Sequence, residues 1–219
     1  MLFQNGERIV FAGDSVTDFA RRRPVGEGLH EGTGTGYVRV IENMINAFYP
    51  EICVRISNMG ISGNNVIDLK NRYDDDVLAL NPDWVSICIG INDVWRFFDS
   101  PTIFNLHIDE ETYKTELEKL ILKTKPVVKG IVLMTPYYIE SRVEDEMRAK
   151  MDNYGKIVKE LAKKHDCIFV DLQAMFDKYL KHRHSTYIAW DRVHPNTVGA
   201  TLIAREFLAA TGFDFDRLK

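Results

Sequence analysis

The chain has 219 residues, 45% of them hydrophobic and 27% charged, which is typical of one globular domain with a full core. Its net charge of −4 gives no electrostatic reason to expect nucleic acid or an anionic membrane as a partner. No apolar run reaches the length that spans a bilayer, and residues 1–7 lack the features of a signal peptide. We therefore expect a single domain, residues 1–219, in the cytoplasm.

The first predicted element is a strand that ends at a serine. Residues 9–12 form an apolar run that favours a strand buried on both faces, and Gly13 permits a sharp turn. Asp14 and Ser15 follow at the carboxyl end of this strand, where open α/β sheets bind ligands. Taken alone, Ser15 is more simply interpreted as a helix N-cap than as a nucleophile.

A polar, glycine-rich segment follows at residues 21–36 and ends in Gly32-Thr33-Gly34-Thr35-Gly36. The pattern invites comparison with a phosphate-binding loop. A dinucleotide fingerprint, however, directly follows the first strand with G-x-G-x-x-G spacing, and this segment does neither. A flexible loop at the active site is the simpler interpretation.

Apolar runs and segments of helical periodicity alternate along the rest of the chain. We expect strands at residues 52–58, 83–89, 127–134 and 167–170, and helices at residues 37–48, 65–80, 109–125, 147–165, from 171 to about 182, and 195–210. Residues 90–101 are expected to form a loop, and Pro195 to lie in the first turn of the last helix. Strands alternating with helices predict a three-layer α/β/α, flavodoxin-like sandwich with a five-stranded parallel sheet of order 2-1-3-4-5.

Neither the cysteines nor the histidines indicate a metal site. Cys53, Cys88 and Cys167 lie far apart in apolar runs, which fits buried, reduced thiols better than a disulfide framework or a zinc site. The polar residues 182–185 include two histidines, and a surface loop is their simpler interpretation. We expect no metal.

Four segments carry the residues that ester hydrolysis needs. Ser15 offers a nucleophilic hydroxyl, and His194 can take its proton. Asp191 precedes His194 by three residues and can reach its Nδ1 within one loop turn. The backbone N–H groups of Ser15 and Gly60 and the side-chain amide of Asn92 can stabilise an oxyanion, each donor contributing on the order of 3 kcal/mol. Each segment alone also fits a turn or a helix cap, and it is their joint occurrence at strand ends that favours a site.

These segments resemble the sequence blocks of the SGNH, or GDSL, hydrolases. The matching blocks are Gly13-Asp14-Ser15, Asn58-x-Gly60-x-Ser62-Gly63, Gly90-x-Asn92-Asp93 and Asp191-x-x-His194-Pro195, with Val16 in place of the leucine of the family name. The resemblance implies a triad of Ser15, His194 and Asp191, oxyanion donors at Ser15, Gly60 and Asn92, and neither metal nor dissociable cofactor. Residues around these blocks are similar to those of bacterial xylan acetyl esterases, which implies a small acylated carbohydrate as substrate and an intracellular homo-oligomer.

Aromatic and polar side chains near the predicted strand ends are candidate substrate contacts: Asp14, Trp95, Arg96, Tyr137 and Trp190. Aromatic rings with polar rims suit sugar rings, which are apolar on one face and hydroxylated at their edges. The tryptophans fit core or subunit contacts equally well. No long apolar lid segment is visible, which argues against a long acyl chain.

The preferred hypothesis is therefore a serine esterase that removes acetyl groups from a carbohydrate. An α/β-hydrolase is disfavoured because Gly13-x-Ser15-x-Thr17 departs from the G-x-S-x-G elbow of that fold at its last position. A thioesterase or lysophospholipase would share the same chemistry with a different acyl group. A non-catalytic module that binds a nucleotide or flavin is a further alternative, supported only by the glycine-rich segment.

Overall fold

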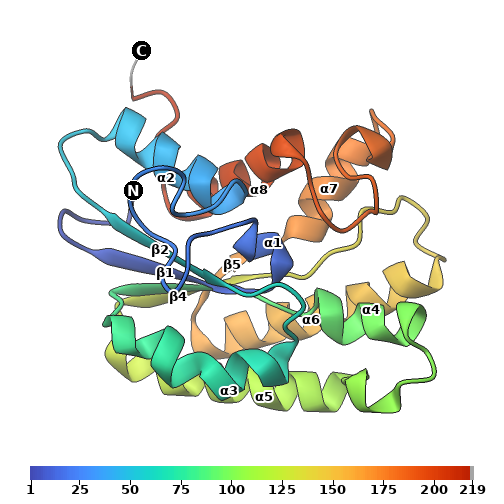
Figure 1. The fold of residues 1–219 in the computed structure, drawn as a ribbon. Helices are drawn as coiled ribbons and strands as arrows, with labels where there is room; N and C mark the ends of the chain where they lie inside the picture. The colour runs from blue at the N-terminus through green and yellow to red at the C-terminus, as the bar shows by residue number, and fades with distance from the viewer. Residues whose placement is uncertain (218–219) are drawn as a thin grey trace.

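The computed structural model describes residues 1–217, in which a five-stranded parallel sheet lies between two layers of helices (Figure 1). The strands are β1 Arg8–Gly13, β2 Arg55–Gly60, β3 Trp84–Cys88, β4 Gly130–Met134 and β5 Ile168–Val170. Their order is β2-β1-β3-β4-β5, so the predicted fold is confirmed. Gly13 pairs with Gly60 on one side and Cys88 on the other, which places three strand ends at one level.

Helices cover both faces of the sheet, as the alternation of elements predicts. One layer contains α2 Tyr37–Phe48, α7 Leu172–Leu180 and α8 Thr197–Ala210, and the other contains α3 Val66–Asp76, α4 Ile91–Asp99, α5 Glu110–Thr124 and α6 Glu146–His165 (Figure 1). Alternate residues of β1 point to opposite layers. Ile9 and Phe11 pack into the first layer, and Val10 and Ala12 pack into the second.

The structure differs from prediction most after β3, where the expected loop is helix α4. Ile91 and Val94 are buried one turn apart and face the core. Asn92 consequently lies in the first turn of a helix at the carboxyl edge of the sheet. At the last helix, the side chain of Asn196 caps α8 by accepting hydrogen bonds from two backbone N–H groups, so Pro195 precedes the helix instead of opening it.

The glycine-rich segment packs closely against α1 Ser15–Asp18 and its C-cap Phe19. A Cβ on Gly34 would lie 2.6 Å from the Phe19 carbonyl oxygen, which accepts a 2.8 Å hydrogen bond from the N–H of Thr35. The hydroxyl of Thr33 donates to the Glu42 carboxylate at 2.7 Å. Close backbone packing therefore explains these glycines without a bound phosphate.

The structure corrects the predicted burial of the cysteines. All three cysteines are unpaired, but only Cys88 is buried; Cys53 is exposed and Cys167 is partly exposed, because both lie outside the strand interiors. Within residues 1–217, no group of three or more His, Cys, Asp or Glu side chains could hold a metal ion. None of the helices described here is long and apolar enough to cross a membrane.

Candidate active site

Ser15 opens the short helix α1 immediately after β1, and the chain turns there within two residues. A Cβ on Gly13 would lie 2.3 Å from the Thr17 hydroxyl and 2.4 Å from the Cys88 carbonyl oxygen, so only glycine fits. The Asp14 carboxylate caps the helix by accepting a 2.9 Å hydrogen bond from the N–H of Val16. Ser15 is the first residue of the helix, and its own N–H therefore has no partner within α1.

Ser15, His194 and Asp191 form a hydrogen-bonded chain, although 179 sequence positions separate the first two. The Ser15 Oγ lies 2.7 Å from Nε2 of His194, and Nδ1 of the same ring lies 2.6 Å from Oδ2 of Asp191. Because a carboxylate only accepts hydrogen bonds, Nδ1 carries the ring proton and Nε2 is free to accept the serine proton. This is the geometry of a nucleophile, its base and an orienting acid.

The second oxygen of Asp191 fixes the carboxylate itself. Oδ1 accepts hydrogen bonds from the backbone N–H of His194 at 2.8 Å and of Val193 at 3.0 Å. Burial alone would raise the pKa of the Asp191 carboxyl, but these bonds and the one from the imidazole outweigh burial and hold that pKa below its ordinary value. The carboxylate is therefore ionised at neutral pH and can stabilise a protonated imidazole.

The segment after β4 holds the loop that carries His194. The Tyr137 hydroxyl donates to the Val193 carbonyl at 3.1 Å, and the Ile139 N–H donates to the Arg192 carbonyl at 2.9 Å. Arg192 has a φ of 64° and forms a 2.7 Å ion pair with Glu140. These contacts fix the backbone on which the imidazole sits.

Gly60 does not offer the free N–H that the sequence predicted. Its N–H donates to Oδ1 of Asn58 at 2.9 Å, because the buried asparagine folds back beside its own strand. A Cβ on Gly60 would lie 2.3 Å from the backbone nitrogen of Asp18, so this glycine permits β2 to approach α1. The prediction of Gly60 as an oxyanion donor is therefore wrong.

Three residues further along, Gly63 has an N–H that is free of such a bond within residues 1–217, unlike that of Gly60. The N–H groups of Ile61, Ser62 and Asn64 are taken by the Gly13 carbonyl, the Asp18 carboxylate and the Ile61 carbonyl, respectively. No such bond is made by the N–H of Gly63 to any residue in 1–217. Its φ is +86° and nothing lies within 4 Å of the position of a Cβ, so the backbone here borders open space. In the sequence, the second glycine of the Asn58–Gly63 block is the feature that could have indicated this N–H.

Asn92 is 2% exposed and is held at both ends of its side-chain amide. Nδ2 donates one hydrogen to the Asn64 carbonyl at 2.9 Å, and Oδ1 accepts from Nη2 of Arg96 at 2.9 Å. An amide nitrogen carries two hydrogens, so one remains for another acceptor. Arg96 lies one helical turn from Asn92 and therefore orients the amide.

Two predicted substrate contacts are buried, and the prediction that they touch substrate is wrong. Asp14 is 1% exposed and Tyr137 is 2% exposed, since the first caps α1 and the second packs beneath the loop of His194. Burial, together with the nearby Asp93 charge, raises the pKa of Asp14 to about 7 against the opposing N–H bond from Val16. Asp93 is also buried, with a pKa raised by burial to about 7.

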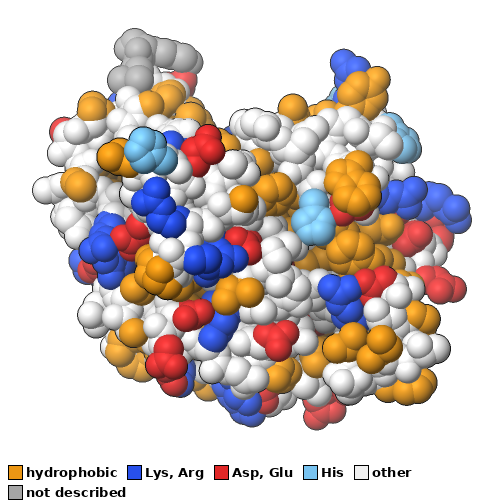
Figure 2. All heavy atoms as spheres, in the orientation of Figure 1, with side chains coloured by type: hydrophobic (Ala, Val, Ile, Leu, Met, Phe, Trp, Pro, Cys, Tyr) orange, Lys and Arg blue, Asp and Glu red, His pale blue; other side chains and the backbone are white. Residues whose placement is uncertain are grey.

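The other predicted contacts lie at or near the surface of this edge. Trp95 places its ring 6.0 Å from the imidazole of His194, measured between centroids, and Phe19 places its ring 6.5 Å away. Trp190 directly precedes Asp191 and is 84% exposed. Figure 2 shows hydrophobic side chains on both sides of a histidine on this face of the molecule.

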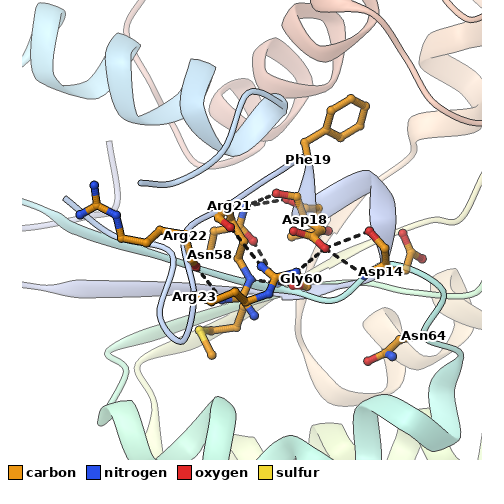
Figure 3. A network of polar contacts seen from close by, with 12 residues as sticks. Asp14, Asp18, Phe19, Arg21, Arg22, Arg23, Asn58, Gly60 and Asn64 are labelled. Atoms are coloured by element: carbon orange, nitrogen blue, oxygen red, sulfur yellow. Dashed lines mark hydrogen bonds and ion pairs between the residues drawn. The ribbon is translucent and has the colours of Figure 1, made fainter. Parts of the chain in front are cut away.

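A polar network that the sequence did not reveal supports the loop beside the serine. One Asp18 oxygen accepts hydrogen bonds from Arg23 at 2.6 Å and from the N–H and hydroxyl of Ser62 at 3.0 and 2.9 Å. Arg21 donates to the Gly60 carbonyl at 2.7 Å (Figure 3). Burial would raise the pKa of Asp18, but the bonds from Arg23 and Ser62 hold it below its ordinary value. This network ties residues 18–23 to the end of β2.

Comparison with known proteins identifies the family. Residues 11–202 match the model of the GDSL-like lipase/acylhydrolase family. The chain belongs to this family. It is a carboxylic ester hydrolase, which excludes the alternative of a non-catalytic binding module.

The relatives of the chain include acetylxylan esterases. It is 49% identical over 217 residues, 99% of both chains, to an acetylxylan esterase from Geobacillus stearothermophilus. The crystal structure of Axe2, an acetylxylan esterase from that organism, matches with a TM-score of 0.96 and 50% identity over 98% of both chains. Structures of its catalytic mutants S15A, D191A and H194A match equally well, with TM-scores of 0.96 to 0.97.

Proposed function

We propose that this hydrolase removes acetyl groups from xylo-oligosaccharides or related small carbohydrates through a triad of Ser15, His194 and Asp191. The main support for this triad is the 2.7 Å contact between Ser15 Oγ and Nε2 of His194. The ionised Asp191 carboxylate, which accepts a hydrogen bond from Nδ1 of the same ring, adds to it. The catalytic mutants of the Geobacillus enzyme carry alanine at the same three positions. The acetylated substrate is supported by 49% identity to that acetylxylan esterase.

The reaction proceeds in two steps. His194 takes the hydroxyl proton of Ser15 as Oγ attacks the acetyl carbon, and the carbonyl oxygen becomes an oxyanion. The oxyanion collapses and expels the sugar alkoxide, which takes the proton from His194 and leaves an acetylated serine. Water then attacks this ester with His194 again as the base, and acetate leaves as Ser15 regains its proton.

Three donors serve the oxyanion in this proposal. They are the N–H of Ser15, the N–H of Gly63 in place of Gly60, and the second amide hydrogen of Asn92. The Ser15 and Gly63 groups make no other bond among residues 1–217, and Asn92 is held with one hydrogen to spare. Donors that are fixed before the reaction stabilise the transition state without reorganisation.

The sugar would lie in a groove that begins at Trp95. This groove has a volume of about 430 Å³ and is lined by Trp95, Phe98, Asp99, Tyr138, Asp145, Glu146 and Met147. Aromatic rings can stack on the apolar face of a sugar, and carboxylates accept hydrogen bonds from its hydroxyls. Acidic lining favours neutral sugars over those that carry a uronic acid. Trp190 is proposed to contact the sugar from the rim, and Arg96 to act through Asn92.

Two broader expectations also remain proposals. Large hydrophobic side chains that are 78 to 84% exposed, at Leu29, Phe104 and Trp190, support a homo-oligomer, since such groups are usually covered in assemblies. Three unpaired cysteines, one of them exposed, suit the reducing cytoplasm. Sedimentation velocity and fractionation of the native host test these two expectations.

The function is tested by measuring acetate release from acetylated xylo-oligosaccharides alongside a chain-length series of p-nitrophenyl esters. We expect rapid deacetylation of the sugar and rates that fall as the acyl chain lengthens. Rates that rise with chain length would instead favour a lipid thioesterase or lysophospholipase. Full activity in Ser15→Ala would overturn the proposed triad.

A further inference from the structure

Arg72, on the second turn of α3, bonds to segments near the three proposed oxyanion donors and is not part of any block that carries the family resemblance. Its side chain is 13% exposed, and its guanidinium makes four hydrogen bonds. Burial lowers the pKa of Arg72, opposed by its pairing with Asp76, yet an arginine stays charged at neutral pH. Only one of its four hydrogen bonds, to Asp76, stays within α3, and the other three reach residues outside the helix.

Three of those bonds end on the segments that carry the donors. Nη2 donates to the Gly13 carbonyl at 3.0 Å, Nη1 donates to the Met59 carbonyl at 2.8 Å, and Nε donates to Oδ1 of Asn64 at 2.6 Å. Gly13 ends β1 two residues before Ser15, and Met59 lies at the end of β2. Asn64 directly follows Gly63 on the loop that leads into α3 (Figure 3).

The third donor is connected through the same residue. The backbone carbonyl of Asn64 accepts the hydrogen bond from Nδ2 of Asn92, so the position of Asn64 sets the position of that amide. The planar guanidinium therefore links the backbone segments that position all three donors. No other side chain in residues 1–217 bonds to Gly13, Met59 and Asn64 together.

We propose that Arg72 is a positioning residue that holds the oxyanion hole in its reactive geometry. It reaches no reacting atom, and it acts through Gly13, Met59 and Asn64. Lysine cannot replace it, because a single ammonium nitrogen cannot span three acceptors that the guanidinium meets through three separate nitrogens. The proposal rests on the oxyanion hole of the proposed function.

The test compares Arg72→Ala and Arg72→Lys with the wild-type protein, using p-nitrophenyl acetate. We expect kcat to fall about 100-fold in Arg72→Ala and about 10-fold in Arg72→Lys, within the range seen when an oxyanion donor is lost. KM should change little, since the ground-state ester does not depend on the hole. Guanidinium chloride at a non-denaturing concentration should raise kcat of Arg72→Ala, whereas sodium chloride at equal ionic strength should not.

Asp76→Asn is the matched control, because it removes the 3.0 Å ion-pair partner of Arg72 and leaves the bonds to the backbone. We expect it to keep wild-type kcat. Wild-type kcat in both Arg72 variants would overturn the proposal, as would an effect confined to KM or a loss of cooperative unfolding in both. Ser15→Ala separates the two proposals: if it is inactive while the Arg72 variants are fully active, only the role of Arg72 fails.

Discussion

The Asn92 side chain allows the loss of one oxyanion donor to be predicted quantitatively. Asn92→Ala removes the free amide hydrogen, which is worth about 3–4 kcal/mol in the transition state, or about 10²–10³ in kcat. It also removes the bonds to the Asn64 carbonyl and from Arg96, each about 1 kcal/mol of folding stability. For a chain of this size, about 2 kcal/mol lowers Tm by roughly 4–8 °C.

These two effects are separable because they differ in kind. At 25 °C the variant remains folded, so a fall of two decades in kcat on p-nitrophenyl acetate reports the transition state. KM should stay close to the wild-type value, since the donor is aimed at the oxyanion and not at the ground-state carbonyl. Steady-state kinetics and a thermal melt are therefore measured on the same preparation.

Asp109→Ala provides a control that lowers stability away from the site. Asp109 caps α5 through a 2.7 Å bond from the N–H of Thr112, and its loss costs about 1 kcal/mol without touching the site. We expect a lower Tm and unchanged kcat. If Asn92→Ala also kept a kcat near that of the wild type, Asn92 would not be an oxyanion donor and the reasoning would fail.

Three further outcomes are expected. Asp191→Asn should lower kcat by about 10⁴, because an amide no longer holds the His194 tautomer and cannot offset its charge; stopped-flow acylation would show a normal rate if this is wrong. Asp14→Asn should flatten the pH dependence of stability measured by urea unfolding. Between its ordinary pKa of 3.8 and about 7, native Asp14 holds a proton that the unfolded chain has released. As pH rises through this range, the wild-type free energy of unfolding should therefore fall by up to about 1.4 kcal/mol per pH unit because of this group. An equal slope in the variant would contradict this prediction. Trp95→Ala should raise KM for acetylated xylo-oligosaccharides more than for p-nitrophenyl acetate, and equal changes would exclude a sugar contact.

The fold and the contact between Asp191 and His194 could be predicted from the sequence because local pattern decides them. Apolar runs such as residues 9–12 identify strands that are covered on both faces, and Asp191 and His194 meet within one loop turn. Helix α4 forms where the sequence predicts a loop. Ile91 and Val94 have helical spacing, but Gly90 and the polar residues beside them favoured a turn.

The residues assigned wrongly are those whose role depends on a tertiary contact. Gly60 matched a block, yet the side chain of Asn58 takes its N–H, and no pattern in the chain reveals that bond. Tyr137 follows a strand end as a substrate contact would, but its ring packs at 2% exposure. Arg72 has the spacing of an ordinary salt bridge with Asp76 and gives no sequence signal for the three bonds it makes elsewhere.

Those same tertiary contacts explain how a loop-based triad achieves a fixed geometry. Ser15 gains its position from β1 and the cap of α1, whereas His194 lies on irregular backbone whose carbonyls must be held from outside. The Tyr137 hydroxyl and the Ile139 N–H hold the Val193 and Arg192 carbonyls of that backbone. The segment after β4 thus restrains His194, and in our proposal Arg72 restrains the oxyanion donors in a similar way. Substitutions at these buried supports should therefore lower kcat while the groove, and with it KM, is left largely unchanged.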